Sequence, residues 1–221
     1  MKIGIIAEGP GDVAVLANIL RGKLGVDGKD ILPIRPELSV DETDLHQRRE
    51  ETFSNWALVK RECVERAKIE AFLTPFGGER LVVIHIDTAE AGLAGYDVER
   101  PRPGDGASAD ELRRRVVEAI NRWLDGHFIA EVRHAVAVEE TDAWVLTLFS
   151  NKDTASHPDP KKALHRALNK PNVLSDKERR RIFQLRAFAF YDELSRPFRK
   201  ARELERCAGR NRSLRLFVDS L

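Results

Sequence analysis

The run Leu81–Asp87 (LVVIHID) constrains the fold of this 221-residue chain more than any other segment. Apart from His85, its first six positions are apolar and do not alternate with polar ones. Strands that are apolar on both faces are typical of parallel sheets with helices on both sides. The run closes on Asp87, whose charge must meet water, a hydrogen-bond donor or a metal ion. It therefore predicts a buried parallel strand with a chemically significant acid at its carboxyl end.

Other apolar runs complete the predicted sheet. Strands are expected at Lys2–Ala7, Ile31–Ile34 and Ile129–Val138. Helices are expected at residues 12–20, 41–72 (one long polar helix or a pair), 109–124 and 143–149. The loop 88–107 is rich in Gly and Pro, which predicts an irregular lid. This alternation of strands and helices predicts an α/β fold, a mostly parallel sheet sandwiched by helices.

Charge divides the chain into two parts. Residues 1–150 carry 19 basic and 27 acidic side chains, whereas residues 151–221 carry 18 and 9. We expect residues 1–150 to form the α/β domain and residues 151–221 to form a basic helical extension packed on it, with helices at 158–168, 175–191 and 195–207. The basic part could hold a polyanion beside an acidic site, or the two parts could simply attract each other.

Composition and the amino terminus indicate a cytoplasmic location. Cys63 and Cys207 are far apart, which supports neither a disulfide framework nor a cysteine-ligated zinc site. The apolar stretch Ile3–Ala7 is too short for a signal peptide, and no segment approaches the roughly 20 apolar residues of a membrane span. We expect no membrane association.

Acidic residues follow three of the predicted strands. Glu8 follows the first, Asp87 closes the LVVIHID strand, and Glu139, Glu140 and Asp142 follow the strand that ends at residue 138. Ligands of open α/β sheets bind outside the carboxyl ends of the strands, so these acids could converge there. Carboxylates at close range repel unless a proton or a cation lies between them, and carboxylate oxygens suit Mg²⁺ or Mn²⁺. The pattern predicts a divalent-metal site.

Each residue also has a structural interpretation. Glu8 could belong only to a turn, Asp12 could be only a helix N-cap, and the acids at 139–142 could be favourable charges at a helix start. His85 shares a strand face with Asp87 and could tune that acid, bind phosphate, ligate the metal or be a satisfied structural histidine. The chain has no P-loop, dinucleotide-binding or serine-nucleophile motif.

Two motifs carry a family resemblance. The segment 3–20 with its Glu8-Gly-x-x-Asp12 core, and the strand ending in Asp87-Thr88, resemble the Toprim superfamily of topoisomerases, primases and overcoming-lysogenisation-defect type nucleases. The segment 139–146 (EETDAWVL) resembles the acid-x-acid-Ala-Trp-Leu-Leu block of a small Toprim-like family of bacterial proteins. The resemblance covers about residues 1–150 and implies a Toprim-like α/β fold there.

The resemblance also implies site residues. Glu8 takes the role of general acid or base, and Asp87 takes the role of an aspartate that holds Mg²⁺ for phosphodiester chemistry. The second aspartate of the usual Asp-x-Asp is Ala89 here. Glu90, Glu140 or Asp142 could replace it, the site could bind one metal ion instead of two, or the site could be inactive. The candidate ligands are Glu8, Asp12, Asp87, Glu90, Glu140 and Asp142, with His85 behind them.

These expectations suggest a Mg²⁺- or Mn²⁺-dependent nuclease or related phosphoryl-transfer enzyme acting on nucleic acid, in bacterial defence or DNA processing. Candidates for contacts to the nucleic-acid backbone are Arg179, Arg180, Arg181, Arg196, Arg199, Lys200 and Arg202. They could instead form a solvated helix face with pairs such as Arg199 to Glu203. Two alternatives are a non-catalytic subunit that binds a protein partner and holds metal or nucleotide as a regulator, and a hydrolase of small phosphoesters.

Overall fold

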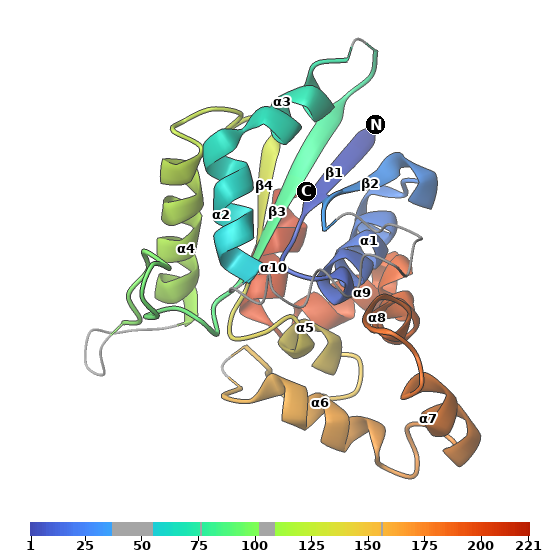
Figure 1. Ribbon diagram of the computed structural model, residues 1–221. Helices are drawn as coiled ribbons and strands as arrows, with labels where there is room; N and C mark the ends of the chain where they lie inside the picture. Colours follow the sequence, from blue (N-terminus) through green and yellow to red (C-terminus); the bar gives the residue numbers. More distant parts are fainter. Residues whose placement is uncertain (37–54, 76, 102–108, 156) are drawn as a thin grey trace.

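Four parallel strands form the central sheet, in the order β2-β1-β3-β4 (Figure 1). The computed structural model describes residues 1–36, 55–75, 77–101, 109–155 and 157–221. Its strands are β1 (Lys2–Ile6), β2 (Ile31–Arg35), β3 (Arg80–Asp87) and β4 (Val132–Ala137). The predicted α/β class, with a parallel sheet between layers of helices, is confirmed.

Strand β3 shows why the central run carries so few polar residues. Val82, Ile84 and Ile86 belong to one hydrophobic cluster, whereas Val83, on the other face, belongs to a second. All four side chains are fully buried, and each contributes about 1.5–3 kcal/mol by leaving water. His85 shares the face of Val83 and is also fully buried. Both faces of β3 are therefore covered, and the carboxyl end of the strand lies at the edge of the sheet.

Three helices cover the face of Ile84 (Figure 1). They are α2 (Asn55–Glu65), α3 (Ala67–Leu73) and α4 (Ala109–Trp123). The amphipathic helix α4 buries Leu112, Val116 and Ile120 at the helical spacing of four residues. The predicted polar helix at 41–72 is thus a pair from residue 55 onward, and its first part lies outside the described residues.

The opposite face is covered by α1 and the carboxyl-terminal helices. They are α1 (Pro10–Leu24), α8 (Ala187–Ser195), the 3₁₀ turn at Arg196–Arg199, α9 (Ala201–Ala208) and α10 (Arg212–Ser220). Helix α1 approaches the 3₁₀ turn so closely that a Cβ on Gly22 would lie 1.9 Å from the carbonyl oxygen of Phe198. Phe198 and Phe217 share a hydrophobic cluster with Ile3 and Ile5 of β1, so residues after 150 complete the core on this face.

Three further helices lie beyond the carboxyl ends of the strands (Figure 1). They are α5 (Asp142–Leu146), α6 (Pro160–Leu168) and α7 (Asp176–Ile182). Within the described residues, no helix is both long and apolar enough to cross a membrane.

Several predicted boundaries were wrong. Strand β4 begins at Val132 and not at 129, because Phe128 adopts a left-handed backbone (φ 58°) in a turn. The helix expected at 175–191 is divided into α7 and α8, and the one expected at 195–207 begins as the 3₁₀ turn. Helix α10 was not predicted. Asp12 is not the N-cap of α1: Gly9 holds that position, and Asp12 lies three residues into the helix.

Candidate functional site

Adjacent strands deliver acidic residues to one edge of the sheet. Glu8 follows β1, Asp87 ends β3, and these strands are direct neighbours. The backbone N–H of Asp87 donates a 2.7 Å hydrogen bond to Oε1 of Glu8, although the residues are 79 positions apart. The predicted convergence of these two acids is therefore present in the structure.

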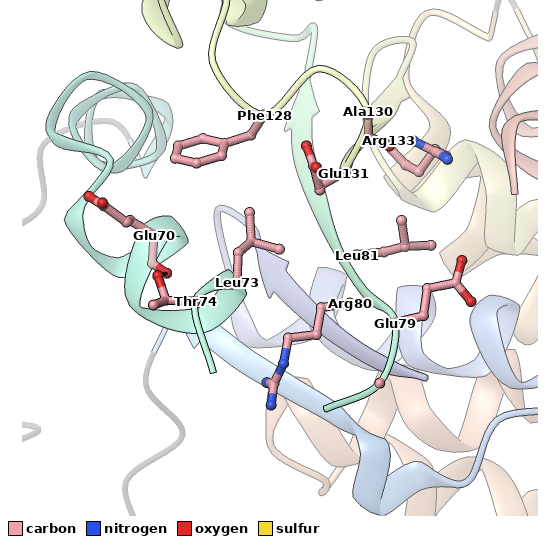
Figure 2. A pocket seen from close by; sticks show the side chains of 11 residues that line it. Glu70, Leu73, Thr74, Glu79, Arg80, Leu81, Phe128, Ala130, Glu131 and Arg133 are labelled. Carbon is pink, nitrogen blue, oxygen red and sulfur yellow. Dashed lines mark hydrogen bonds between the residues drawn. The ribbon is translucent and has the colours of Figure 1, made fainter. Parts of the chain in front are cut away.

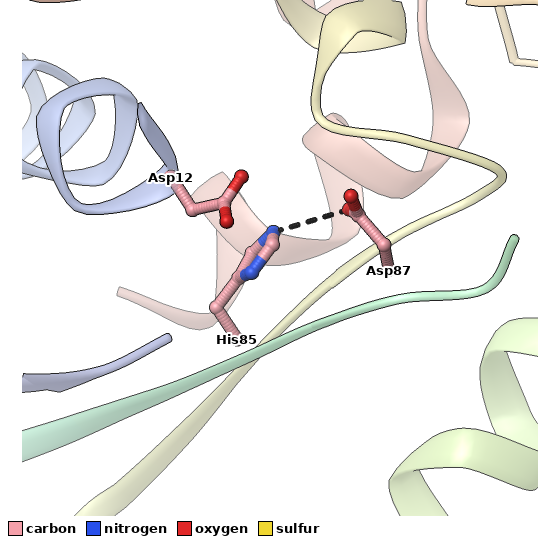
Figure 3. Close-up of side chains that lie close together, drawn as sticks. All are labelled: Asp12, His85 and Asp87. Carbon is pink, nitrogen blue, oxygen red and sulfur yellow. Dashed lines mark ion pairs between the residues drawn. The ribbon is translucent and has the colours of Figure 1, made fainter. Parts of the chain in front are cut away.

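Asp12, His85 and Asp87 form the centre of the site (Figure 3). One ligand atom from each lies within 4.8 Å of the others, and among the described residues no other set of three or more His, Cys, Asp or Glu side chains meets this limit. Asp12 reaches the site from the first turn of α1, where its Oδ2 accepts a 2.9 Å hydrogen bond from the backbone N–H of Gly9. His85 and Asp87 come from β3, with Nε2 of His85 3.5 Å from Oδ1 of Asp87.

Thr141 lies between these three side chains. Its Oγ1 is 2.8 Å from Oδ1 of Asp12, 3.1 Å from Oδ1 of Asp87 and 2.9 Å from Nε2 of His85. A hydroxyl has one hydrogen and can donate it to one acceptor at a time. When Thr141 donates to one aspartate, the other carboxylate oxygen faces the hydroxyl oxygen without a hydrogen between them. With both aspartates ionised, the site therefore has more acceptors than hydrogens.

His85 is a neutral hydrogen-bond donor at the back of the site. Burial lowers its pKa and outweighs the opposing influence of Asp12. Its Nδ1 is buried and has no hydrogen-bond partner among the described residues, whereas Nε2 faces Thr141. A histidine that ligates a metal normally donates its other N–H to an acceptor, and Nδ1 lacks one. The contacts thus favour a proton on Nε2, donated to Thr141. The position of His85 behind the ligands stays a prediction.

Burial and mutual repulsion shift the carboxyl groups of Asp87 and Glu8. Burial raises the pKa of Asp87 well above its ordinary value, and the charges of Asp12 and Glu8 raise it further, although 22% of its side chain is exposed. Burial likewise raises the pKa of Glu8 to about 8, against the hydrogen bond from Asp87 N–H and the charge of Arg35. Such groups are neutralised by protons or by a bound cation.

The other predicted ligands lie around this centre. Glu90 is half-buried, its Oε2 has no partner within the described part of the chain, and its charge contributes to the raised pKa of Glu8. The hydroxyl of Tyr191 lies 2.9 and 3.1 Å from the two carboxylate oxygens of Asp142 and donates its one hydrogen to this carboxylate. Burial raises the pKa of Asp142 to about 6, and the half-buried Glu140 adds to the shift. Like Glu8, these three acids do not belong to the compact group of Asp12, His85 and Asp87.

Glu139 has a structural contact instead. Arg100 forms a bidentate pair with its carboxylate, at 2.8 and 2.9 Å, and also donates to the backbone oxygens of Thr88, Ala89 and Ala91. This arginine fastens the loop after β3 to the end of β4. The loop is thereby held at the rim of the site.

Sequence reasoning missed four residues of the site: Thr141, Tyr96, Arg100 and Tyr191. Tyr96 donates a 2.6 Å hydrogen bond to the carbonyl oxygen of Asp87 and fixes the backbone there. Thr141 stands inside the acidic segment 139–142, which is a signal of position but not of role. Tyr96 and Arg100 lie in the Gly- and Pro-rich loop, and no sequence pattern links them to the acids.

The predicted basic contacts are divided between ion pairs and exposed positions. Arg181 pairs with Glu193, Arg179 lies 3.4 Å from Asp176, and Arg196 and Arg199 both approach Asp192. The pair suggested between Arg199 and Glu203 was wrong, because Arg199 reaches back to Asp192 and to Asn18 at 2.5 Å. Arg180, Lys200 and Arg202 are exposed, and so are the ion-paired Arg181 and Arg196.

One hollow is far from the acidic site at the carboxyl edge of the sheet. It has a volume of about 580 Å³ and lies at the amino ends of β3 and β4, lined by Arg80, Phe128, Glu131 and their neighbours (Figure 2). A second hollow of about 490 Å³ is lined partly by Arg100 and Glu139, at the carboxyl edge of the sheet. Only the second is on the side of the molecule where the acids gather.

Comparisons with known proteins give no further identification. No family model matches the chain, and neither curated proteins nor solved structures give a match.

Proposed function

We propose that this protein is a Mg²⁺- or Mn²⁺-dependent phosphoryl-transfer enzyme, a nuclease that cleaves phosphodiesters in nucleic acid. The observation that carries the proposal is the meeting of Asp12 and Asp87 at the hydroxyl of Thr141, where acceptors outnumber hydrogens. A divalent cation balances such a set, and hard carboxylate oxygens are what Mg²⁺ and Mn²⁺ prefer. The resemblance of residues 1–150 to the Toprim superfamily is part of this proposal.

The residues divide into distinct roles. Asp12 and Asp87 would hold the cation, which supplies charge stabilisation at the phosphate under attack. Glu8, fixed by the backbone N–H of Asp87, handles the proton beside them. His85 and Thr141 keep the two aspartates in place by hydrogen bonding.

Asp12 is the proposed replacement for the second aspartate, which is Ala89 in this chain. Ala89 is exposed and supplies no oxygen to the site. Asp12, from the first turn of α1, supplies a carboxylate to the group containing Asp87. In the proposal, Asp12 is the partner of Asp87, whereas Glu90, Glu140 and Asp142 are outer acids.

The exposed Ala89 also favours a second candidate function. A site with one cation and fewer ligands suits a non-catalytic subunit that binds metal or nucleotide as a regulator of a protein partner. The two candidates predict different behaviour in a cleavage assay.

The test is cleavage of labelled single- and double-stranded DNA and RNA with Mg²⁺ or Mn²⁺, compared with EDTA. The nuclease predicts metal-dependent cleavage that falls about 100-fold or more in Glu8→Gln and in Asp87→Asn. Glu70→Gln on the exposed surface of α3 is the matched control and should cleave as wild type does. Absence of cleavage of every substrate with every metal supports the regulatory subunit instead.

A further inference from the structure

Four aromatic side chains form a line that leads away from the acidic site. The rings of Tyr191 and Phe190 have centroids 5.1 Å apart, Phe190 and Phe183 are 6.0 Å apart, and Phe183 and His165 are 5.1 Å apart. These residues come from α8, from the end of α7 and from α6. Helices α6 and α7 lie off the carboxyl edge of the sheet, α6 next to α5 and α7 farther out, below α8 (Figure 1).

The inner end of this line touches the acids. Tyr191 donates its hydroxyl hydrogen to the carboxylate of Asp142. The ring of Tyr191 packs against Gly11, where a Cβ would lie 2.6 Å from Cδ2 of the tyrosine. Gly11 directly precedes Asp12, so the aromatic line begins beside a proposed metal ligand.

The outer end of the line is open to solvent. Phe183 is 39% exposed, and His165 is exposed as well. Lys162, His165 and Arg166 line an open hollow of about 410 Å³. An aromatic surface beside an open, basic hollow is suited to a planar, anionic ligand.

Cationic side chains lie near the line of rings. Lys161 lies close enough to Asp142 to oppose the rise in the pKa of that acid. Lys162 and Arg166 are exposed on α6, with Nζ of Lys162 2.7 Å from Oδ2 of Asp159. Arg180 is exposed three residues before Phe183 and so occupies the same side of α7. Positively charged side chains therefore lie near both ends of the line of rings.

We propose that this line, from His165 and Phe183 to Tyr191, is a track for single-stranded nucleic acid that leads a strand to the acidic site. Unpaired bases stack on Phe183 and His165 while Lys162 and Arg166 contact the phosphates, as in other single-strand binding surfaces. A duplex keeps its bases paired inside and offers only phosphates to the cations. This inference rests on the proposed function, since it names the form of nucleic acid that the site takes.

The test is binding of a fluorescein-labelled 12-residue oligothymidylate, and of the duplex of that strand with oligodeoxyadenylate, measured by anisotropy in EDTA. We expect the single strand to bind more tightly than the duplex. Phe183→Ala should weaken single-strand binding about fivefold or more, and Phe183→Trp should bind as wild type does. Lys162→Ala with Arg166→Ala should weaken binding and reduce its dependence on salt.

Matched controls are Ile129→Ala, which removes an apolar side chain that is 63% exposed, and Arg61→Ala, which removes an exposed cation of α2. Both should bind as wild type does. The track is overturned if Phe183→Ala keeps its circular dichroism spectrum and binds the single strand normally, or if the duplex binds as tightly as the single strand. Mn²⁺-dependent hydrolysis of bis(p-nitrophenyl) phosphate separates the two proposals. If only the track is wrong, this hydrolysis persists while single-strand binding fails the test above. If hydrolysis is absent but the single strand binds as expected, the proposed enzyme activity is rejected and the track is kept.

Discussion

Asp87 and Glu8 are joined across β3 and β1 by a 2.7 Å hydrogen bond from the backbone N–H of Asp87 to Oε1 of Glu8. The bond ties the end of one strand to the loop after its neighbour. It also brings the two carboxyl groups together, so the charge of Glu8 adds to the rise in the pKa of Asp87 that burial and Asp12 cause. The account of the site depends on this placement.

Asp12→Asn and Asp87→Asn should each leave the metal-free protein as stable or slightly more stable, and should each make the protein less stable than the wild type in Mn²⁺. Each removes a charge from a crowded set, so the free energy of unfolding in EDTA should stay equal or rise by about 1 kcal/mol. Each should also abolish the stabilisation that Mn²⁺ gives the wild type, which is about 2.7 kcal/mol at 100 times the dissociation constant. Urea denaturation with and without Mn²⁺ measures both. Full Mn²⁺ stabilisation of both variants would contradict the proposed ligands.

Thr141→Val keeps the shape of the side chain and removes the hydroxyl that Asp12, His85 and Asp87 share. His85 then loses its nearest partner, and we expect the free energy of unfolding in EDTA to fall by about 1–3 kcal/mol. Thr74→Val is the matched control, because Thr74 is exposed and its hydroxyl donates to the carbonyl oxygen of Glu70 one turn earlier. The control should change stability by no more than about 0.5 kcal/mol. Equal effects in urea denaturation would show that the Thr141 hydroxyl has no special role.

Gly11→Ala should destabilise the protein although alanine is the better helix former. Its Cβ would enter the space of the Tyr191 ring and push the ring away from Asp142, at a cost of about 1–3 kcal/mol. Gly28→Ala is the control, since its Cβ would meet Arg21 Nη1 at an ordinary 3.6 Å. Thermal unfolding of both variants checks this. A Gly11→Ala protein more stable than the wild type would disprove the contact.

His134 should make the protein sensitive to acid. Burial lowers its pKa to about 4, helped by the charges of Arg113 and Arg133, and its Nε2 lies 2.9 Å from Oδ1 of Asn121. Because the pKa is depressed in the folded state, the unfolded chain takes up the proton first as the pH falls. Stability should be full above about pH 6.5 and fall by about 1–3 kcal/mol towards pH 4.

His134→Gln keeps a hydrogen-bonding side chain that does not titrate and should remove that part of the pH dependence. The comparison requires denaturation curves for wild type and variant between pH 4 and pH 8. Parallel pH profiles for the two proteins would assign the acid sensitivity to other groups. His127→Gln, at an exposed histidine in the turn before β4, is the control and should follow the wild type.

The parallel sheet and the proximity of Glu8 and Asp87 could be predicted from the sequence. Apolar runs such as Leu81–Asp87 identify buried strands, and parallel order places Glu8 and Asp87 at one edge. Helix boundaries were harder to predict. Residues 183–186 contain neither Gly nor Pro, so nothing in the sequence indicated the break between α7 and α8.

Contacts made by tertiary packing could not be predicted either. Tyr191 donates a hydrogen bond to Asp142, 49 residues away in the sequence. Arg199 donates one to Asn18, 181 residues away. Thr141 has no motif of its own, since a hydroxyl between acids gains its role only when α1 and β3 approach it. Likewise Asp12 was expected as an N-cap or as a ligand, and the fold places its two oxygens on Gly9 and Thr141.

The most direct test of the metal site is a crystal of the protein soaked in Mn²⁺, with an anomalous difference map collected from it. We predict a peak in contact with carboxylate oxygens of Asp12 and Asp87, with Glu8 beside it. A map with no peak there, or with the strongest peak on other residues such as Glu140 and Asp142, would contradict the account.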